Sequence, residues 1–249
     1  MGEKRDLIAL FIDCDNISHR AIEGIIKELS RYGVVNIRQA YGNWSKENLK
    51  NWEEKLLEYA IKPIQQFDYS KNKNATDILM TIDAIDMLHT KKLDAFAFAT
   101  SDSDFTPVVM RLQAEGIKVY GFGEKKTPKA LVASCSQFVF TDNLLESDSS
   151  GSRAKQSSKT TRKSKRELQK DKWLVNLLQS AVEQTADEYG WANLADVGTF
   201  ISNSTSFSPL NFGYKKLSSI IKEIELFDIA FDEVSLQMSI RDKRFREDF

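Results

Sequence analysis

The chain has 249 residues, with 35 Lys and Arg side chains against 36 Asp and Glu, and a formal net charge of −1. This length is enough for one large domain or two smaller ones, each with its own core. The composition argues against several classes of protein, because no apolar stretch approaches the roughly 20 residues of a membrane helix and two histidines are too few for a multi-histidine metal site or a histidine-based triad.

The first ten residues lack the basic and then apolar plan of a signal peptide, so we expect a cytoplasmic protein with no membrane partner. Cys14 and Cys135 form no CxxC pair, and each lies in an apolar context that is typical of a small buried thiol. Neither zinc nor a disulfide is predicted. Any hydrolytic chemistry should therefore depend on carboxylates, which favour hard metal ions.

Residues 1–146 alternate short apolar runs with helical patterns. The runs are LIALFI, VVNIRQAY, AIKPIQQF, DAFAFAT, IKVYGFG and QFVF, and the helical patterns between them cover Ile17–Tyr32, Ser45–Tyr59, Thr76–His89, Phe105–Glu115 and Pro128–Cys135. Continuous runs of Val, Ile, Leu, Phe and Ala are typical of parallel strands that helices cover on both faces. The pattern predicts an α/β domain with a doubly wound, mainly parallel sheet.

Residues 147–167 are predicted to be a basic flexible linker. Ser147–Arg166 is rich in Ser, Lys and Arg, and it holds no aromatic or aliphatic residue beyond one alanine that could anchor it to a core. Two interpretations remain open. The segment is a merely solvated connection, or it is a strap whose Arg162, Lys163, Lys165 and Arg166 add salt-dependent affinity for a phosphate backbone.

Residues 168–249 are predicted to form a second, small domain. Helical patterns at Asp171–Tyr189, Asn193–Ser202 and Tyr214–Ile224 precede DIAFDEVSLQMSI, which is typical of a strand pair. We expect a winged-helix-like α+β module. Residues 167–249 hold 9 Lys and Arg against 14 Asp and Glu, so broad nonspecific affinity for nucleic acid is not expected.

Acidic side chains follow two of the predicted strands. Asp13, Asp15 and Asn16 come directly after LIALFI, and Asp102 and Asp104 come after FAFAT. In open α/β sheets, sites form at the carboxyl ends of the strands. We therefore expect these side chains to meet at one edge of the sheet.

A third acidic contribution is expected from the helical pattern over Thr76–His89. At about 100° per residue, its apolar face is predicted to consist of Ile78, Ile82, Ile85 and Leu88. Asp77 lies at the margin of that face, so we expect it to point towards the strand ends. Asp83 and Asp86 are expected to point largely away.

Converging carboxylates repel one another unless a cation lies between them, and Mg²⁺ or Mn²⁺ suits such ligands. Each side chain also has an ordinary structural role open to it. Asp104 or Asn16 could cap a helix, Asp102 could form a turn, Asp77 could be a first-turn acid, and Asp15 could be solvated. Their joint placement favours a metal site.

Three separated segments, FIDCDN, TDILMTIDAI and TSDSDFTPVVMRLQAEGIKVYGFG, resemble the NYN domain of the PIN-like nuclease superfamily, especially its LabA-like branch. The resemblance covers about residues 5–145. It implies a metal-dependent ribonuclease with functional acids at Asp13, Asp77, Asp102 and Asp104, together with Asn16. All of these match. The turn NATD departs from the family, where many relatives carry a glycine before the helical aspartate, and aspartates like Asp83 recur there.

The segment Gly190–Ile229 resembles the OST-HTH or LOTUS domain through its apolar spacing around NFGYKKLSSII. The resemblance implies a winged-helix module that binds RNA, including guanine-rich folded RNA, or proteins. Lys215 and Lys216, at an expected helix start, are then the natural phosphate contacts, although as solvated lysines they need no explanation. Tyr214, Leu217 and Ile220 are expected in the core.

The leading hypothesis is an endoribonuclease with Mg²⁺ or Mn²⁺ as cofactor, acting on single-stranded or structured RNA. One alternative is a regulatory adaptor that binds RNA or protein with little nuclease activity. Another is a DNA-directed nuclease of the flap type, since nothing in the sequence separates RNA from single-stranded DNA. Protein partners of the C-terminal module and a homodimer are compatible with either.

Overall fold

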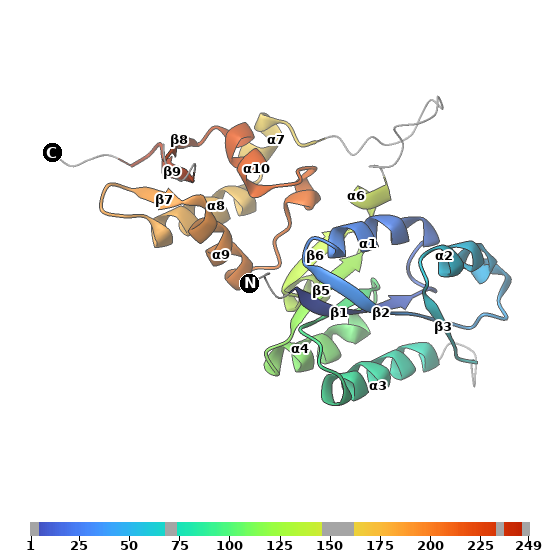
Figure 1. Cartoon of the computed structure of the whole chain (residues 1–249). Coiled ribbons are helices and arrows are strands. Elements are labelled where there is room, and N and C mark those ends of the chain that lie inside the picture. Colours follow the sequence, from blue (N-terminus) through green and yellow to red (C-terminus); the bar gives the residue numbers. More distant parts are fainter. Residues whose placement is uncertain (1–4, 68–73, 146–161, 233–236, 246–249) are drawn as a thin grey trace, which may run out of the picture. The chain divides into compact units, whose positions relative to one another are not determined.

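The computed structural model describes residues 5–67, 74–145, 162–232 and 237–245. The chain divides into two compact units, Met1–Lys155 and Gln156–Phe249 (Figure 1). No helix among the described residues is long and apolar enough to cross a membrane.

The N-terminal unit contains a parallel sheet of six strands in the order β3-β2-β1-β4-β5-β6. The strands are β1 Asp6–Asp13, β2 Gly33–Gly42, β3 Lys62–Gln65, β4 Ala95–Ala99, β5 Lys118–Gly123 and β6 Gln137–Phe140. The doubly wound α/β fold expected from the apolar runs is therefore confirmed, with all six runs present as strands.

Helices cover both faces of this sheet. Figure 1 shows α1 and α6 on one face and α3 and α4 on the other. The helices of the unit are α1 Ile22–Leu29, α2 Glu53–Glu58, α3 Ala75–Thr90, α4 Thr106–Ala114, α5 Lys129–Ser134 and α6 Asp142–Leu145, with 3₁₀ turns η1 His19–Ala21, η2 Glu47–Trp52 and η3 Ser103–Phe105.

Aromatic rings fill the layer between the sheet and α3–α4. Phe11 lies at the centre, with its ring 5.7 Å from that of Tyr41, 5.8 Å from Phe96 and 5.4 Å from Phe98. All four residues are buried. Burying one such side chain stabilises a fold by about 1.5–3 kcal/mol. The cluster therefore fixes β1, β2 and β4 relative to one another, and with them the positions of their carboxyl ends.

The buried face of α3 differs from the predicted one. Thr76, Met80 and Ala84 are buried, whereas Ile78 and Ile82 are 61% and 57% exposed. The prediction was wrong for Ile78 and Ile82, whereas Ile85 and Leu88 are partly buried against the core. Because α3 is apolar on most of its sides, periodicity alone did not select a face. Thr76, Met80 and Ala84, which lie four positions apart, form the stripe that lies against the sheet.

The C-terminal unit combines helices with a three-stranded antiparallel sheet in the order β7-β9-β8. Its strands are β7 Trp191–Asn193, β8 Phe227–Phe231 and β9 Met238–Asp242. Its helices are α7 Lys165–Lys170, α8 Lys172–Thr185, α9 Leu194–Ser204 and α10 Leu217–Ile224, with the 3₁₀ turn η4 Pro209–Phe212. The expected α+β module and its final strand pair are confirmed, and β7 is an addition.

The end of the expected linker is helical. α7 begins at Lys165, and Ser164 and Glu167 form a capping box in which each side chain accepts a hydrogen bond from the other residue's backbone N–H. Leu168 is fully buried and anchors this short helix. Residues 162–167 therefore belong with the C-terminal unit, while the rest of the expected linker, 147–161, lies outside the described residues.

Candidate active site

The direction in which successive strands are added to the sheet changes at β1 and β4, which are neighbours in space. β2 and β3 lie on one side of β1, and β4, β5 and β6 follow on the other. Parallel sheets form their ligand-binding crevice at such a switch point, outside the carboxyl ends of the strands. Asp13 ends β1, and Asp102 follows the end of β4, so both acids lie at this crevice.

Asp13 is a buried carboxylate in which only one of the two oxygens accepts hydrogen bonds from described residues. It is 1% exposed. Its Oδ2 accepts hydrogen bonds from Thr100 Oγ1 at 2.8 Å and from Asn16 Nδ2 at 2.7 Å. Its Oδ1 is buried without a hydrogen-bond partner among the described residues. Burial, and to a smaller extent the charge of Asp15, raises the pKa of this carboxyl, and the bonds from Thr100 and Asn16 together with the backbone of Asp15 only partly oppose the shift.

Thr100 is a site residue that the sequence reasoning missed. Its buried hydroxyl donates to Asp13 and also accepts from the backbone N–H of Asp102 at 3.1 Å. The sequence signal that could have identified it is its place at the end of an apolar strand, two residues before Asp102. The side chain of Asn16 donates to Asp13 and orients its carboxylate. Asn16 does not cap the following helical turn, because Ser18 caps η1.

Asp77 lies in the first turn of α3 and is half-buried. Its pKa is raised to about 6, chiefly by burial and then by the negative charges of Asp13, Asp102 and Asp104. The negative charges of the other three proposed site acids therefore act on the carboxyl of Asp77. Repulsion of this kind is relieved by a cation or by a proton.

Asp102 and Asp104 hold the turn that follows β4. Asp102 caps η3, with its Oδ1 accepting from the backbone N–H of Asp104 at 2.9 Å. Asp104 is exposed, and its Oδ2 accepts from Asn74 Nδ2 at 3.0 Å. Asp102 is therefore the capping residue of this turn, and Asn74 links it to the start of α3.

Two further aspartates lie at the periphery. Asp15 is exposed, with its Oδ1 3.8 Å from Lys46 Nζ. Asp83 was expected to point away from the sheet, but its Oδ2 accepts a hydrogen bond from Tyr41 Oη at 2.8 Å, across to β2. That expectation was wrong for the same reason as the apolar face of α3, since the helix is rotated from the predicted orientation.

The donor set suits a hard divalent cation. Among the described residues, no three His, Cys, Asp or Glu side chains are gathered closely enough to hold an ion as they stand. Yet the buried Oδ1 of Asp13 lacks a partner among the described residues, and the pKa of Asp77 is raised first by burial and then by the neighbouring carboxylates. Carboxylate oxygens are the preferred ligands of Mg²⁺ and Mn²⁺, so these residues fit such an ion chemically.

Comparison with known families agrees with this geometry. The family model of the NYN domain matches residues 7–148. The chain belongs to the NYN domain family. This family is part of the PIN-like nuclease superfamily, so the N-terminal unit is a nuclease-like domain.

Behind the NYN domain, the family model of the OST-HTH/LOTUS domain matches residues 168–235. The C-terminal unit is accordingly an OST-HTH domain, a type associated with RNA binding. The two domains follow in the order that the sequence motifs predicted.

Individual relatives of this NYN protein are distant. An uncharacterized protein of Methanocaldococcus jannaschii is 27% identical over 142 residues, which cover 55% of each chain, so the match spans about half of that relative. A crystal structure of a Vibrio parahaemolyticus protein of unknown function is 18% identical, with a TM-score of 0.46, over 56% of this chain and 95% of the other. A solution structure from Nitrosomonas europaea is 27% identical, with a TM-score of 0.28, over 41% and 94%. Neither TM-score supports a structural argument.

The basic residues expected to contact RNA all lie in the OST-HTH domain. Arg162 pairs with Glu223 at 2.7 Å, Lys163 pairs with Asp171 at 3.0 Å, and Lys165 pairs with Glu225. Arg166 is exposed on α7. Lys215 and Lys216 are exposed just before α10. Three of the four expected strap residues thus also serve to hold their own domain together.

Proposed function

We propose that this protein is a metal-dependent endoribonuclease that hydrolyses RNA phosphodiesters. The NYN domain would hold one or two Mg²⁺ or Mn²⁺ ions through Asp13, Asp77, Asp102 and Asp104. The observation that carries this proposal is the buried Asp13, whose Oδ1 has no partner among the described residues, at the switch point of the sheet. A buried carboxylate oxygen left without a partner is costly unless a ligand completes it.

The neighbouring residues position this carboxylate. Thr100 and Asn16 both bind Oδ2 of Asp13, which leaves Oδ1 for a cation. Asn74 orients Asp104 in the same way from the start of α3. A bound divalent ion would stabilise the negative charge that develops on the phosphodiester during attack by water.

The OST-HTH domain would recruit the RNA substrate. Its basic residues Arg162, Lys163, Lys165, Arg166, Lys215 and Lys216 provide cations that can contact phosphates. The domain's overall acidic balance limits binding to a local surface or to a folded RNA shape. Protein partners of this domain and a homodimer are further proposals.

The test is a cleavage assay with Asp13→Asn and Asp102→Asn on single-stranded RNA, structured RNA and DNA, in Mn²⁺, Mg²⁺ or EDTA. Each substitution should lower cleavage on the order of 10²-fold or more. The fold should persist, since an amide keeps the acceptor oxygen and removes repulsion. Asp15→Asn is the matched control, because this exposed acid is only two residues from Asp13, and it should cleave nearly as the unmodified chain does.

The outcomes separate the competing functions. Undiminished cleavage in EDTA would sink the metal-dependent mechanism. RNA binding without cleavage under every metal condition would identify an adaptor instead. Preferential cleavage of branched DNA over RNA would point to a flap-type nuclease.

A further inference from the structure

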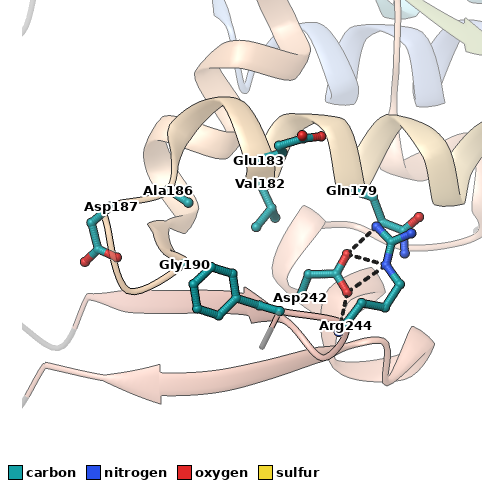
Figure 2. A pocket seen from close by; sticks show the side chains of 9 residues that line it. Gln179, Val182, Glu183, Ala186, Asp187, Gly190, Asp242 and Arg244 are labelled. Atoms are coloured by element: carbon teal, nitrogen blue, oxygen red, sulfur yellow. Dashed lines mark hydrogen bonds and ion pairs between the residues drawn. The ribbon is translucent and has the colours of Figure 1, made fainter. Parts of the chain in front are cut away.

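The OST-HTH domain has an acidic cavity near the C-terminal end of α8 and a basic segment near the N-terminal end of this helix. Near the C-terminal end of that helix lies a cavity of about 550 Å³, whose charged lining residues are Glu183, Asp187, Asp242 and Arg244 (Figure 2). Its cation, Arg244, is engaged by Asp242 at 2.7 Å, which leaves the carboxylates Glu183 and Asp187 to set the local charge. This end of the domain is unsuited to a polyanion.

The other end of α8 is basic. Residues 162–172 hold six Lys and Arg side chains against two acids. Glu223 and Glu225 pair with Arg162 and Lys165 there, so six cations face four acids and the local excess is two positive charges. Lys170 and Lys172 are exposed and form no ion pair with another described residue. Lys170 lies in the last turn of α7, where the helix dipole favours a cation, whereas Lys172 begins α8, where the dipole opposes one. Ten residues of helix, about 15 Å, separate Trp173 from Glu183.

An exposed indole ring lies within this basic region. Trp173 is 53% exposed in the first turn of α8. Its ring centroid is 6.3 Å from that of Phe207, which is 5.7 Å from that of the buried Phe212. The outer end of this aromatic row is therefore open to solvent, while its inner end is fixed in the core.

Two cations of the basic segment contact aromatic rings of the domain, and one of these rings is Phe212 of the row. Lys163 Nζ lies 4.5 Å from the ring centroid of Phe212 and is held there by Asp171. The Arg162 guanidinium lies 4.5 Å from the ring centroid of Tyr214, whose hydroxyl donates to the carbonyl of Lys163. The segment that carries the basic charge is thus fastened to the aromatic residues rather than independent of them.

We propose that Trp173 is a base-stacking residue for single-stranded RNA and that Lys170 and Lys172 contact the adjoining phosphates. This inference rests on the proposed function, and it locates the recruitment of RNA at the start of α8. A rigidly supported aromatic face stacks on any base, and neighbouring cations neutralise the backbone. The local excess of positive charge favours a polyanion over a protein surface of mixed charge.

The test measures the affinity of the full-length protein, in EDTA, for fluorescently labelled oligouridine and oligoadenosine. Trp173→Ala should weaken binding about 10-fold, whereas Trp173→Phe, which keeps a stacking ring, should stay within about 3-fold. Replacing Lys170 and Lys172 by alanine should weaken binding and flatten the dependence of log K on log salt by about 1.4, the value for two phosphate contacts on a single strand. Tyr189→Ala is the control, because Tyr189 is 60% exposed but is next in sequence to Gly190, which lines the acidic cavity.

A second readout guards against misfolding of the alanine variant. The chain has four tryptophans, and quenching of their fluorescence by the oligonucleotide should be largely lost in Trp173→Phe although binding persists. Unchanged affinity in Trp173→Ala, or an equal loss in Tyr189→Ala, overturns the inference, and the first of these results would instead favour a protein-docking surface.

Cleavage by the same proteins in Mn²⁺ keeps the two proposals apart. If the unmodified chain fails to cleave, the proposed function falls, whereas the binding result for Trp173 is still read by itself. If the unmodified chain cleaves but Trp173→Ala binds RNA as tightly, only the stacking site is lost.

Discussion

Thr100 joins the ends of β1 and β4 through one hydroxyl. It donates to the carboxylate of Asp13 and accepts from the backbone N–H of Asp102, so two proposed metal ligands from different strands share one positioning group. Groups that orient a ligand in this way commonly change activity by 10–100-fold when removed.

Thr100→Val should therefore lower kcat for RNA cleavage by about 10-fold at saturating Mn²⁺, because Asp13 loses one of the two bonds that fix its orientation. It should also lower the free energy of unfolding by roughly 1–2 kcal/mol, since the Asp102 N–H is left without its acceptor. Thr100→Ser keeps the hydroxyl and is the control. Equal kcat values for the valine and serine variants would show that the hydroxyl does not position the site.

Asp77 couples folding to pH. Its folded pKa of about 6 lies above the roughly 3.9 of an unfolded aspartate, so the folded state binds this proton more tightly. The stabilising contribution of the protonated group is full below about pH 4 and is lost as pH rises through about 6. The ionised carboxylate then destabilises the metal-free fold.

Asp77→Asn should therefore raise the stability of the NYN domain at pH 7–8 in EDTA by about 1 kcal/mol, after allowance for solvent screening of a half-buried group. The advantage should shrink as the pH falls and disappear by about pH 3, where Asp77 is neutral in both the folded and the unfolded state. Urea unfolding at several pH values measures this difference. A gain that is the same at pH 4 and pH 8 would have another origin than charge.

At the level of single elements, α7 shows how a local signal defines a boundary. The sequence Ser164-Lys165-Arg166-Glu167 is a capping box, and the buried Leu168 follows it directly. The basic composition of the surrounding segment predicted a linker up to residue 167. The capping residues and one leucine nevertheless begin a helix within it.

Ser164→Ala should lower the stability of the OST-HTH domain by about 1 kcal/mol, because the first backbone N–H groups of α7 lose their acceptor. Ser164→Asp should largely keep it, since aspartate is an equally good cap. Ser180→Ala, at an exposed position within α8, is the control for replacing a serine in this domain. Urea denaturation followed by circular dichroism measures all three, and a loss no greater at 164 than at 180 would contradict the cap.

At the scale of the whole molecule, chemistry and recruitment are assigned to separate compact units. All proposed ligands lie in Met1–Lys155, and all proposed RNA contacts lie in Gln156–Phe249. Each unit also has its own hydrophobic core. Removal of the second unit should therefore affect substrate affinity more than the reaction itself.

A chain shortened to residues 1–145 should keep kcat within about 3-fold, because it retains every proposed metal ligand. Its KM for RNA should rise on the order of 10-fold, because the proposed RNA contacts are lost, and this change in affinity corresponds to about 1.4 kcal/mol. The full-length protein should also show the steeper loss of RNA affinity with salt, because its basic residues displace counterions. Steady-state cleavage and binding at several salt concentrations measure both. Equal affinity and equal salt dependence in the two proteins would assign the OST-HTH domain to protein binding.

The sequence by itself determined the sheet and the acids at its edge. Continuous apolar runs are buried wherever helices cover both faces, so their pattern predicts strands without knowledge of the partners. Asp13 and Asp102 follow such runs directly, and the carboxyl ends of neighbouring parallel strands must meet. These features are local or follow from the geometry of a parallel sheet.

Three features were decided only by the tertiary structure. They are the buried face of α3, the hydrogen bond from Thr100 to Asp13, and the position of Trp173 at the outer end of an aromatic row. Thr100 and Asp13 are 87 positions apart, Asp83 and Tyr41 are 42 apart, and Trp173 contacts Phe207 from a different element. A helix that is apolar on several sides can present any of them, and a hydroxyl or a ring can serve many partners. Long-range packing selects one arrangement among these, because only one brings all the buried surfaces together at full density.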